Sequence, residues 1–540
     1  MVSLLWPAGE VGPEHLGRIG DAAMTDLELD RLADQIAQDR PDRRFAVRAA
    51  LGRPPLQPEV VAWRSETSRD LLEVAGLWDG LRRAADTLRI LTQHRPQAFA
   101  RETPRAGRIG ARVVELQAYV ESLQALDAAL AQAPLRADAL RCLAQEVAAD
   151  LARPEVRALV KVLPEWRQTL DEVRAVTIAV NVSPAMEPEA AAITGFSRTP
   201  ATPGETALAR ILGEQEGAKG LARLRRREAT AEGPFGAMEG PLAREVQALL
   251  ETVAAPVERA LHGYRLVHAQ GLAHLEPELV VLLGATALAR QWRSRGLPVC
   301  CAEVGEGLVA REAYHPVLAG QLASGELVRN AVEFGPAGSV WILTGPNRGG
   351  KTTYLRTVGV VQVLGQSGLP VPAAACRLAP ADQVLTHFPG PELGQKGKGR
   401  LDEEAARLAE IFGQCSGRTL VLLNEVLSGT SAPEGVALAQ DVLAGFRALG
   451  ARVVYATHLH ELAARIEAIN AAVPGPGRVA SLTVEAAAAE PGVQRPTYRV
   501  VPGVPGGASW FASHIAREHG ISLPQLLESF RQRGQGAPGA

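Results

Sequence analysis

The chain has 540 residues, of which 46% are hydrophobic and 21% are charged, and its formal net charge is −2 at pH 7. It is too long for one compact core, and its composition is typical of a folded protein rather than a disordered one. The small net charge excludes a polycationic protein, so any contact with nucleic acid must come from local basic patches or a groove between subunits.

Residues 1–105 are predicted to form an N-terminal helical core segment, with breaks at 40–44 (RPDRR) and 52–58 (GRPPLQP). A long helix is then predicted at 107–133, because apolar residues recur there at steps of three or four. This stripe consists of Ile109, Val113, Leu116, Val120, Leu123, Leu126 and Leu130. Such a stripe is typical of the core of a helix bundle and by itself indicates no chemistry.

Residues 106–297 are predicted to contain long helices and further core. A second helical stretch is expected from about 136 to 175, broken near Pro154 and Pro164. The β-branched alternation of 176–183 then predicts a strand. Helical patterning resumes from about 241 to 296.

Between these helical parts, residues 198–240 are rich in Gly, Pro, Ala and charge, and they predict a polar surface excursion or a linker. The segment 221–229 (LARLRRREA) contains arginines at 223, 225, 226 and 227 that can meet phosphates. A solvated charged helix face explains the same arginines equally well, so both interpretations stay open.

From about residue 298 the predicted secondary structure changes to alternating strands and helices, which is typical of an α/β domain. Short apolar runs at 340–345 (VWILTG), 418–425 (RTLVLLNE) and 452–458 (RVVYATH) predict strands of a largely parallel sheet, each followed by turn residues or a helical pattern. We assign residues 298–522 to this domain. Residues 523–540 are predicted to form a short C-terminal helix and a disordered tail.

The cysteines and the apolar runs predict no metal, redox or membrane role. The five cysteines are Cys142, Cys300, Cys301, Cys376 and Cys415. Their spacing matches no zinc or redox motif and fits buried small side chains in a reducing compartment. The N-terminus has no basic region, and no uninterrupted apolar stretch reaches about 18 residues. We therefore expect a cytoplasmic protein without a membrane partner.

A phosphate-binding loop is predicted at Gly345–Thr352 (GPNRGGKT), which satisfies the pattern G-x-x-x-x-G-K-[ST] between a strand and a helical pattern. Its glycines allow a tight turn whose N–H groups face phosphate oxygens. Lys351 would reach the β- and γ-phosphates, and Thr352 would ligate Mg²⁺. Lysine occurs only five times in the chain, so a chance match is improbable. The alternative is a Gly-rich turn without a ligand.

Two further polar positions follow predicted strands. Glu425 comes just after the apolar run 420–423, where it can polarise the water that attacks the γ-phosphate. A helix-capping carboxylate is the alternative. His458 follows the strand at 452–456 and is placed to sense the γ-phosphate. Its alternative is a structural histidine.

Together these segments resemble a known family. GPNRGGKTTYLRTVG, NEVLSGTSAPEG and YATHLHEL, in this order, resemble the ATPase domain of the MutS family. YHPVL (314–318) and LVRN (327–330) resemble the lead-in to its phosphate loop, and residues 497–521 resemble its closing segment. AVTIAVNVSPAMEP (175–188) is similar to the core-and-lever region of shorter members. The resemblance is specific over about 310–522 and rests on pattern over about 55–310.

The resemblance implies a multidomain protein in which a mainly α-helical core and lever region precedes an α/β P-loop NTPase domain of the ABC type. It also implies a homodimer that binds ATP, Mg²⁺ and DNA, with lever helices coupling the nucleotide to DNA held between the subunits. The implied nucleotide-binding residues are Gly345, Pro346, Asn347, Arg348, Gly349, Gly350, Lys351, Thr352 and Thr353. The implied catalytic residues are Glu425 and His458, and the implied metal site is Thr352 with Asn424.

Three positions depart from the family pattern. Asn424 replaces an Asp, so it can bind a metal-bound water but brings no charge, and we expect weaker Mg²⁺ binding and slow hydrolysis with nucleotide binding retained. Gly399 and Arg400 stand where a Ser-Thr pair faces the partner's γ-phosphate. Two interpretations stay open here: Lys396, Lys398 and Arg400 serve as cationic substitutes, or they belong to a mobile basic loop. Leu327 occupies the position of an adenine-stacking aromatic ring.

Family features that read mismatches are not found in the sequence. None of the ten phenylalanines is followed two residues later by Glu, as the mismatch-reading wedge requires. We expect no separate N-terminal mismatch-recognition domain, no clear clamp insertion and no nuclease domain after Ile521.

The leading hypothesis is a dimeric, ATP-switched DNA clamp in repair or recombination that binds mismatched, branched or otherwise distorted DNA without direct mismatch reading. The alternatives are a non-catalytic nucleotide-binding scaffold, which Asn424 and Gly399 favour, and a transporter-type ATPase. The last predicts an LSGGQ-like signature, which the sequence lacks.

Overall fold

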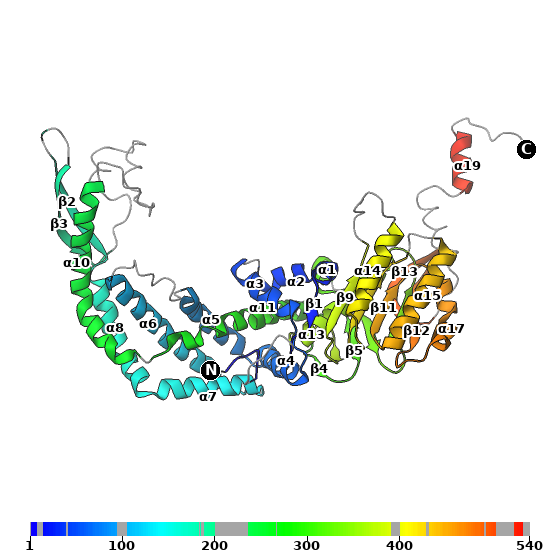
Figure 1. Ribbon diagram of the computed structural model, residues 1–540, viewed down its shortest axis with the longest axis horizontal. Helices are drawn as coiled ribbons and strands as arrows, with labels where there is room; N and C mark the ends of the chain where they lie inside the picture. Colours follow the sequence, from blue (N-terminus) through cyan, green and yellow to red (C-terminus); the bar gives the residue numbers. More distant parts are fainter. Residues whose placement is uncertain are drawn as a thin grey trace, which may run out of the picture. The chain divides into compact units, whose positions relative to one another are not determined.

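The computed structural model describes residues 2–7, 15–38, 41–93, 105–182, 184, 188–199, 236–265, 267–323, 325–389, 400–427, 431–490, 493–503 and 523–532 (Figure 1). The described residues form two units. Unit 1 contains residues from 83–131 and 144–276, and unit 2 contains residues from 2–82, 132–143 and 277–540. The sequence domains with boundaries near 105, 297 and 522 stay a prediction, because these units group residues by their contacts rather than by chain order.

Unit 1 is mainly helical. Its long helices are α6 (Arg105–Leu130), α8 (Pro154–Asp171) and α10 (Gly236–Leu261), and short 3-10 helices follow at η4 (His262–Tyr264) and η5 (Ala269–Leu272). All seven apolar residues of the predicted stripe are buried on α6, which packs against α8, α10 and η5. The helix predicted at 107–133 and its core-facing stripe are therefore confirmed.

The strand predicted at 176–183 is also confirmed and belongs to a hairpin. Strand β2 (Ala175–Val182) pairs antiparallel with β3 (Pro188–Ser197). The predicted polar excursion at 198–240 falls largely on 200–235, outside the described residues. Helix α10 begins at Gly236, earlier than the helical pattern near 241 indicates.

One predicted break is wrong. Helix α7 (Asp138–Ala152) ends before Pro154, which begins α8 at a position where proline is tolerated. Pro164, however, lies inside α8 rather than at its end. The neighbouring side chains of Leu163 and Trp166 are buried, and their packing outweighs the backbone hydrogen bond that a proline removes.

The N-terminal segment of unit 2 is helical, as predicted, and the predicted break at 52–58 falls between two helices. The break predicted at 40–44 is misplaced, because a helix already begins at Pro41. The helices of this segment are α1 (Asp21–Asp26), α2 (Leu29–Ala37), α3 (Pro41–Gly52) and α4 (Pro58–Glu73), and α5 (Leu77–Gln93) follows. The sequence analysis missed the two-residue strand β1 (Arg18–Ile19), which pairs parallel with β9. A strand this short has no readable alternation, so only its pairing partner defines it.

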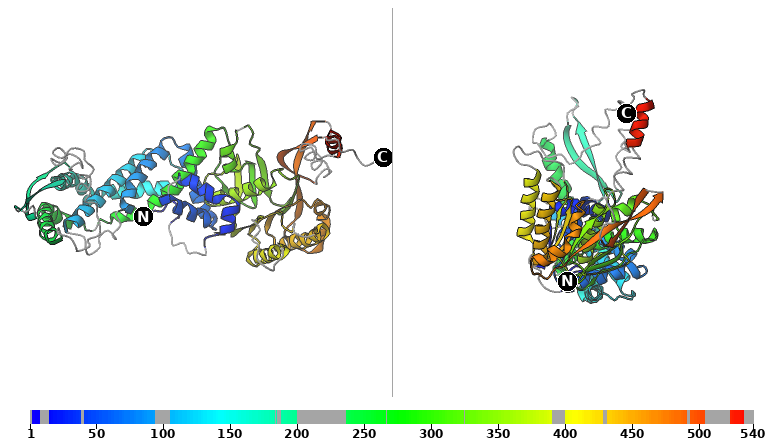
Figure 2. Two further views of the ribbon diagram at one scale, coloured as in Figure 1. Left: turned by 90° about the horizontal axis from the view of Figure 1, so that it is seen from above. Right: turned by 90° about the vertical axis from the view of Figure 1, so that its right-hand side faces the viewer.

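A seven-stranded sheet forms the centre of unit 2, in the order β1-β9-β10-β11-β7-β12-β13. Its remaining strands are β7 (Val340–Thr344), β9 (Gln383–His387), β10 (Leu420–Asn424), β11 (Arg452–Ala456), β12 (Val479–Glu490) and β13 (Val493–Pro502). All neighbours run parallel except β12 and β13, which form the long orange hairpin of Figure 2. The three predicted apolar strands are β7, β10 and β11, and every residue in them is buried.

Helices cover this sheet according to the alternation of its side chains. Val421 and Leu423 of β10 face a core shared with α14 (Arg400–Gln414) and α15 (Ala432–Leu449) (Figure 1). Leu422, between them, faces α13 (Lys351–Gln366), where a Cβ atom on Gly359 would come within 3.0 Å of its side chain. Two short helices, α16 (Glu461–Ala464) and α17 (Ile466–Ala472), follow β11.

A second sheet of unit 2 has the order β4-β8-β5-β6. Its strands are β4 (Glu303–Val304), β5 (Leu308–Ala313), β6 (Asn330–Phe334) and β8 (Ala375–Leu378). Helices α11 (Leu275–Ser294) and α12 (Pro316–Gln321) precede β4 and follow β5, respectively, and α19 (Leu523–Gln532) confirms the predicted C-terminal helix. The predicted tail at 533–540 lies outside the described residues.

One helical stretch in the described part of the chain, Ala269–Ser294, is long and apolar enough to cross a membrane by composition alone. Within its most apolar window, 72% of the residues are buried inside the protein. That burial is what the core helix of a folded domain shows.

Candidate functional site

The loop between β7 and α13 has a backbone that only glycine tolerates at its two ends. Gly345 and Gly350 have φ angles of +149° and +90°. A Cβ atom would also lie 2.8 Å from the Val484 side chain at the first position and 3.2 Å from the Tyr498 ring at the second. The spacing of glycines that predicted this loop therefore corresponds to its real backbone requirement.

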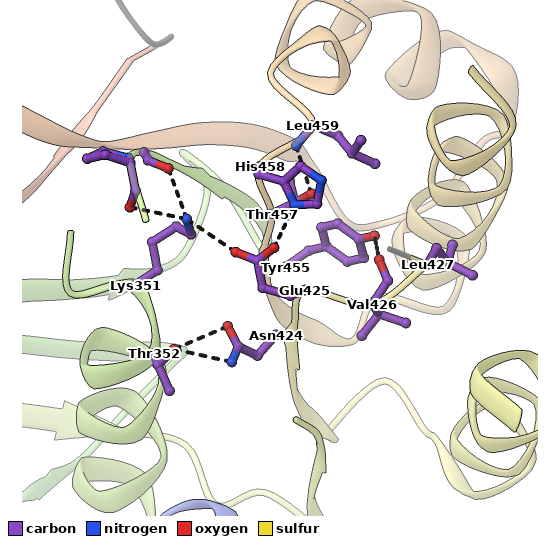
Figure 3. Close-up of polar contacts among 12 residues, drawn as sticks. Lys351, Thr352, Asn424, Glu425, Val426, Leu427, Tyr455, Thr457, His458 and Leu459 are labelled. Carbon is purple, nitrogen blue, oxygen red and sulfur yellow. Dashed lines mark hydrogen bonds and ion pairs between the residues drawn. The ribbon is translucent and has the colours of Figure 1, made fainter. Parts of the chain in front are cut away.

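Lys351, the first residue of α13, is buried at the end of this loop, with 5% of its surface exposed. Its ammonium group donates hydrogen bonds to the carbonyl oxygens of Gly345, at 2.9 Å, and Pro346, at 3.4 Å. It also forms an ion pair with Glu425, with 3.2 Å between Nζ and Oε1 (Figure 3). The lysine therefore faces oxygen atoms on two sides.

Glu425 connects the lysine to a histidine. Its second carboxylate oxygen, Oε2, lies 2.6 Å from Nδ1 of His458 (Figure 3). The backbone N–H of Glu425 donates to the carbonyl of Ala456 at 2.8 Å, because β10 and β11 end side by side. Parallel pairing thus places two residues that are 33 positions apart in the sequence within hydrogen-bonding distance.

The turn that carries Glu425 is strained and held by neighbours. Glu425 and Leu427 have φ angles of +55° and +63°, a conformation that costs a non-glycine residue about 1–2 kcal/mol. The Tyr455 hydroxyl donates to the Val426 carbonyl at 2.7 Å, and the Leu427 N–H donates to Glu404 at 2.8 Å. These bonds compensate for the strain and fix the direction of the Glu425 carboxylate.

Thr352 and Asn424 form a second contact across the same gap. The Asn424 side-chain amide donates to the Thr352 hydroxyl at 3.2 Å, and its Oδ1 lies 3.4 Å from the same hydroxyl (Figure 3). These residues fit a metal ion only partly, since they supply a hydroxyl and a neutral amide oxygen. No cluster of three or more His, Cys, Asp or Glu side chains suited to a metal occurs among the described residues.

We call Lys351, Thr352, Asn424, Glu425 and His458 the loop cluster. A cavity of about 940 Å³ adjoins it and is lined by the predicted loop residues from Pro346 to Thr353 and by Glu425. The structure thus brings together almost all the residues predicted for one site. Lys396, Lys398 and Gly399 lie outside the described residues, as does the side chain of Arg400.

Two residues that line this cavity were missed. Tyr498, on β13, is 49% exposed, and its carbonyl accepts a hydrogen bond from the Asn330 side chain at 3.0 Å. The sequence feature that could have identified Tyr498 is its aromatic ring within the segment 497–521. Tyr498 lines the same cavity as Leu327, which is only 7% exposed.

The other missed residue is His315, which is 3% exposed and whose Nε2 has no hydrogen-bond partner. Burial lowers the pKa of His315 to about 4, against a smaller opposing effect of Glu28, 3.9 Å from its Nδ1. The sequence feature that could have identified His315 is the YHPVL segment, which indicated this region of the domain but not the role of the histidine.

Part of the chain that carries this site is similar to known proteins. Residues 341–500 match the family model described as MutS domain V. A DNA mismatch repair protein MutS from Sorangium cellulosum is 36% identical over 160 residues, which cover 29% of this chain and 17% of that protein. The corresponding protein of Rhodopirellula baltica is 34% identical over 211 residues, covering 39% and 23%. That of Parasynechococcus marenigrum is 39% identical over 168 residues, covering 30% and 18%.

The fold and the site define the class first: an α/β domain with a Gly-rich loop between a strand and a helix at the carboxyl edge of a parallel sheet. Within this class, residues 341–500 are similar to MutS domain V, and the C-terminal part of the chain resembles proteins named DNA mismatch repair protein MutS. The matches span about a fifth of the length of these relatives, between 17 and 23%.

Proposed function

We propose that this chain is a MutS-like ATPase that binds ATP and Mg²⁺ at the loop cluster. The observation that carries the proposal is the connection from Lys351 through Glu425 to His458, built at the ends of β10 and β11 and at the start of α13. Phosphate oxygens are acceptors of the same kind as the carbonyl and carboxylate oxygens that already surround the Lys351 ammonium group.

In this proposal Glu425 accepts a proton from the attacking water. Its carboxylate is held from one side by the Lys351 ammonium group and from the other by the His458 ring, so its direction is set before any reaction. His458 positions Glu425 and completes the path along which a proton can leave. The bound Mg²⁺ would neutralise charge on the phosphates.

Thr352 and Asn424 would hold this ion. Asn424 is 5% exposed and lies against the Thr352 hydroxyl, the position from which it would contact a metal-bound water. Because an amide carries no charge, it attracts a divalent cation less than a carboxylate does. We therefore propose tight nucleotide binding with slow hydrolysis.

The cavity has an apolar and an aromatic side chain in its lining that can contact the adenine base of ATP. Leu327 lines one part of the cavity, and the half-exposed Tyr498 ring lines another beside Gly350. We assign the adenine to the space that these two side chains line, with Tyr498 supplying the stacking surface that the leucine lacks.

The DNA partner, the homodimer and the role in repair or recombination are also part of the proposal. They are supported by the relatives, which are named DNA mismatch repair proteins, and by unit 1, where α6 and α10 are each 26 residues long. A helix of that length extends about 39 Å, which suits a lever. Recognition of distorted DNA without direct mismatch reading rests on the resemblance alone.

Asn424 favours one alternative, a scaffold in which ATP binding stabilises an assembly without turnover. Single-turnover hydrolysis with excess protein separates the two functions. A measurable rate that Glu425→Gln abolishes, with ATP binding intact, supports the enzyme. ATP binding without any hydrolysis supports the scaffold, and no ATP binding at all by the natural protein overturns both.

A further inference from the structure

A second cavity of unit 2 combines four arginines with small apolar residues in its lining. Its volume is about 660 Å³, and we call Arg69, Arg293, Arg311 and Arg377, which surround it, the arginine bowl. Arg69 lies on α4, Arg293 on α11, and the other two on β5 and β8. Two carboxylates, Glu73 and Glu303, also line it.

The pairing register places the two strand arginines on one face of the second sheet. Arg377 is opposite Val309, and Arg311 is opposite Ala375, so the two arginines are diagonal neighbours. Side chains in that relation lie within about 7–8 Å of each other, and like charges at such positions repel. Both arginines are exposed, which identifies this as the open face of the sheet.

These positive charges form no ion pair within the described part of the chain, although Glu303 is opposite Arg377 in the pairing of β4 with β8. Within the described part of the chain, no hydrogen bond or ion pair engages the side chain of Arg69, Arg311 or Arg377, whereas Arg48 contacts both Asp21 and Asp30. Glu73 is paired with Arg136 at 3.0 Å, outside the bowl. Four arginines against two glutamates leave the lining with a formal charge of +2, in a chain whose total is −2.

The thiols of the bowl do not change this balance. Cys300 and Cys301 line the same cavity, and burial raises the pKa of each to about 12. Both thiols are therefore protonated and neutral at pH 7. The bowl offers guanidinium groups above an uncharged floor.

We infer that the arginine bowl binds backbone phosphates of nucleic acid. Guanidinium groups on four rigid elements present forked donors that match phosphate oxygens. Cavities for small metabolites usually carry only a small number of polar groups, whereas four arginines and two glutamates line this one. The inference rests on the DNA partner of the proposed function and adds a contact surface separate from the nucleotide cavity, with which the bowl shares no lining residue.

Gly305 provides a way to move one arginine without removing its charge. A Cβ atom at this position would lie 2.6 Å from Cδ of Arg377, so the arginine side chain lies directly over the glycine. Gly305→Ala should displace this flexible side chain, because the contact involves its methylene groups rather than any backbone atom.

The test measures binding of fluorescent duplex DNA to the full chain, by anisotropy, across salt concentrations. The double variant Arg311→Ala, Arg377→Ala should lower affinity for all sequences alike and reduce the slope of log affinity against log salt by about 2. Gly305→Ala should reduce the slope by less. The matched control Arg478→Ala, Arg495→Ala removes two exposed arginines outside the bowl and should leave the slope unchanged.

ATP binding, measured on the same samples, checks that every variant is folded. A slope that stays at the natural value in the double variant, or that falls equally in the control, overturns the inference while the proposed function stands. Binding of inorganic pyrophosphate that the double variant loses, with an unchanged DNA slope, also overturns it in favour of a small phosphate ligand. If the natural protein binds ATP but no DNA, both the inference and the proposed DNA partner fail.

Discussion

The loop cluster and the arginine bowl both gather positive charge in unit 2, but they treat it differently. In the loop cluster Lys351 is buried and its charge is paired with Glu425, which is itself paired with His458. In the bowl Arg311 and Arg377 are exposed, and neither forms a hydrogen bond or ion pair through its side chain within the described residues. A paired, buried charge sets geometry for chemistry, whereas an unpaired, exposed one supplies attraction over a distance.

The largest effect is expected when the Glu425 carboxylate, the negative charge of the loop cluster, is removed. Glu425→Gln keeps the shape of the side chain but cannot take a proton, so single-turnover ATP hydrolysis should fall by about 10²–10⁴-fold. ATP affinity, measured by calorimetry, should be retained. Equal hydrolysis rates in the variant and the natural protein would remove Glu425 from the proposed chemistry.

The next effect concerns binding. Lys351→Ala removes the buried ammonium group and should weaken ATP binding by about 10- to 100-fold, the value of a charged hydrogen bond. Arg478→Ala, which removes an exposed charge elsewhere in unit 2, is the control and should bind ATP normally. Unchanged ATP affinity in Lys351→Ala would contradict the assignment of the nucleotide to this loop.

A fall in pH should reduce folding stability through a group of the nucleotide cavity rather than through the bowl. His315 is buried there with a pKa of about 4, below the value of about 6.5 expected in the unfolded chain. The unfolded state therefore takes up a proton first, and the stability that His315 contributes above pH 6.5 is lost as pH falls towards 4. The loss should reach about 2 kcal/mol between pH 7 and pH 5.

Urea unfolding at both pH values measures this loss. His315→Gln should show a smaller difference between pH 7 and pH 5 than the natural protein, whatever its stability at pH 7. Burial raises the pKa of Cys300 and Cys301 to about 12, so these thiols do not titrate over this range, and Arg311→Ala, which leaves His315 in place, should leave the pH difference as it is. An unaltered difference in His315→Gln would show that other groups cause the acid sensitivity.

A smaller effect is expected when a negative charge is restored at the proposed metal position. Asn424→Asp places a carboxylate beside the Thr352 hydroxyl, which can donate to it, and should lower the Mg²⁺ concentration for half-maximal hydrolysis by about tenfold. A magnesium titration of the turnover rate measures this. The same magnesium dependence in both proteins would discard the explanation for slow hydrolysis.

The smallest effect is a difference in the free energy of unfolding between a variant that removes an unpaired arginine and a variant that removes a paired one. Arg311→Ala should raise the free energy of unfolding by about 0.2–1 kcal/mol, because it removes a like charge diagonal to Arg377. Arg329→Ala, which removes an ion pair with Glu312 at 2.6 Å, should instead lower it by a similar amount. Chemical denaturation of all three proteins at one ionic strength tests the opposite signs.

Local patterns were enough to predict the helix at 107–133, three buried strands and the Gly-rich loop with its lysine. These features are encoded by spacing within a few residues, through the helical repeat, continuous apolar runs and the special freedom of glycine. The position of Glu425 and His458 at neighbouring strand ends also followed, because parallel strands bring their carboxyl ends to one edge. Their contact with each other, at 2.6 Å, was not predicted.

Everything that depends on partners distant in the chain was outside the reach of sequence alone. The strand at Arg18–Ile19 exists because β9 pairs with it, and α8 continues through Pro164 because its neighbours are buried. Tyr498 and Gly350 are 148 positions apart in the sequence (498 − 350), yet a Cβ atom added to Gly350 would lie 3.2 Å from the Tyr498 ring. The arginine bowl joins four separate elements in the same way. Such contacts arise from packing free energy summed over the folded chain, and no short segment contains that information.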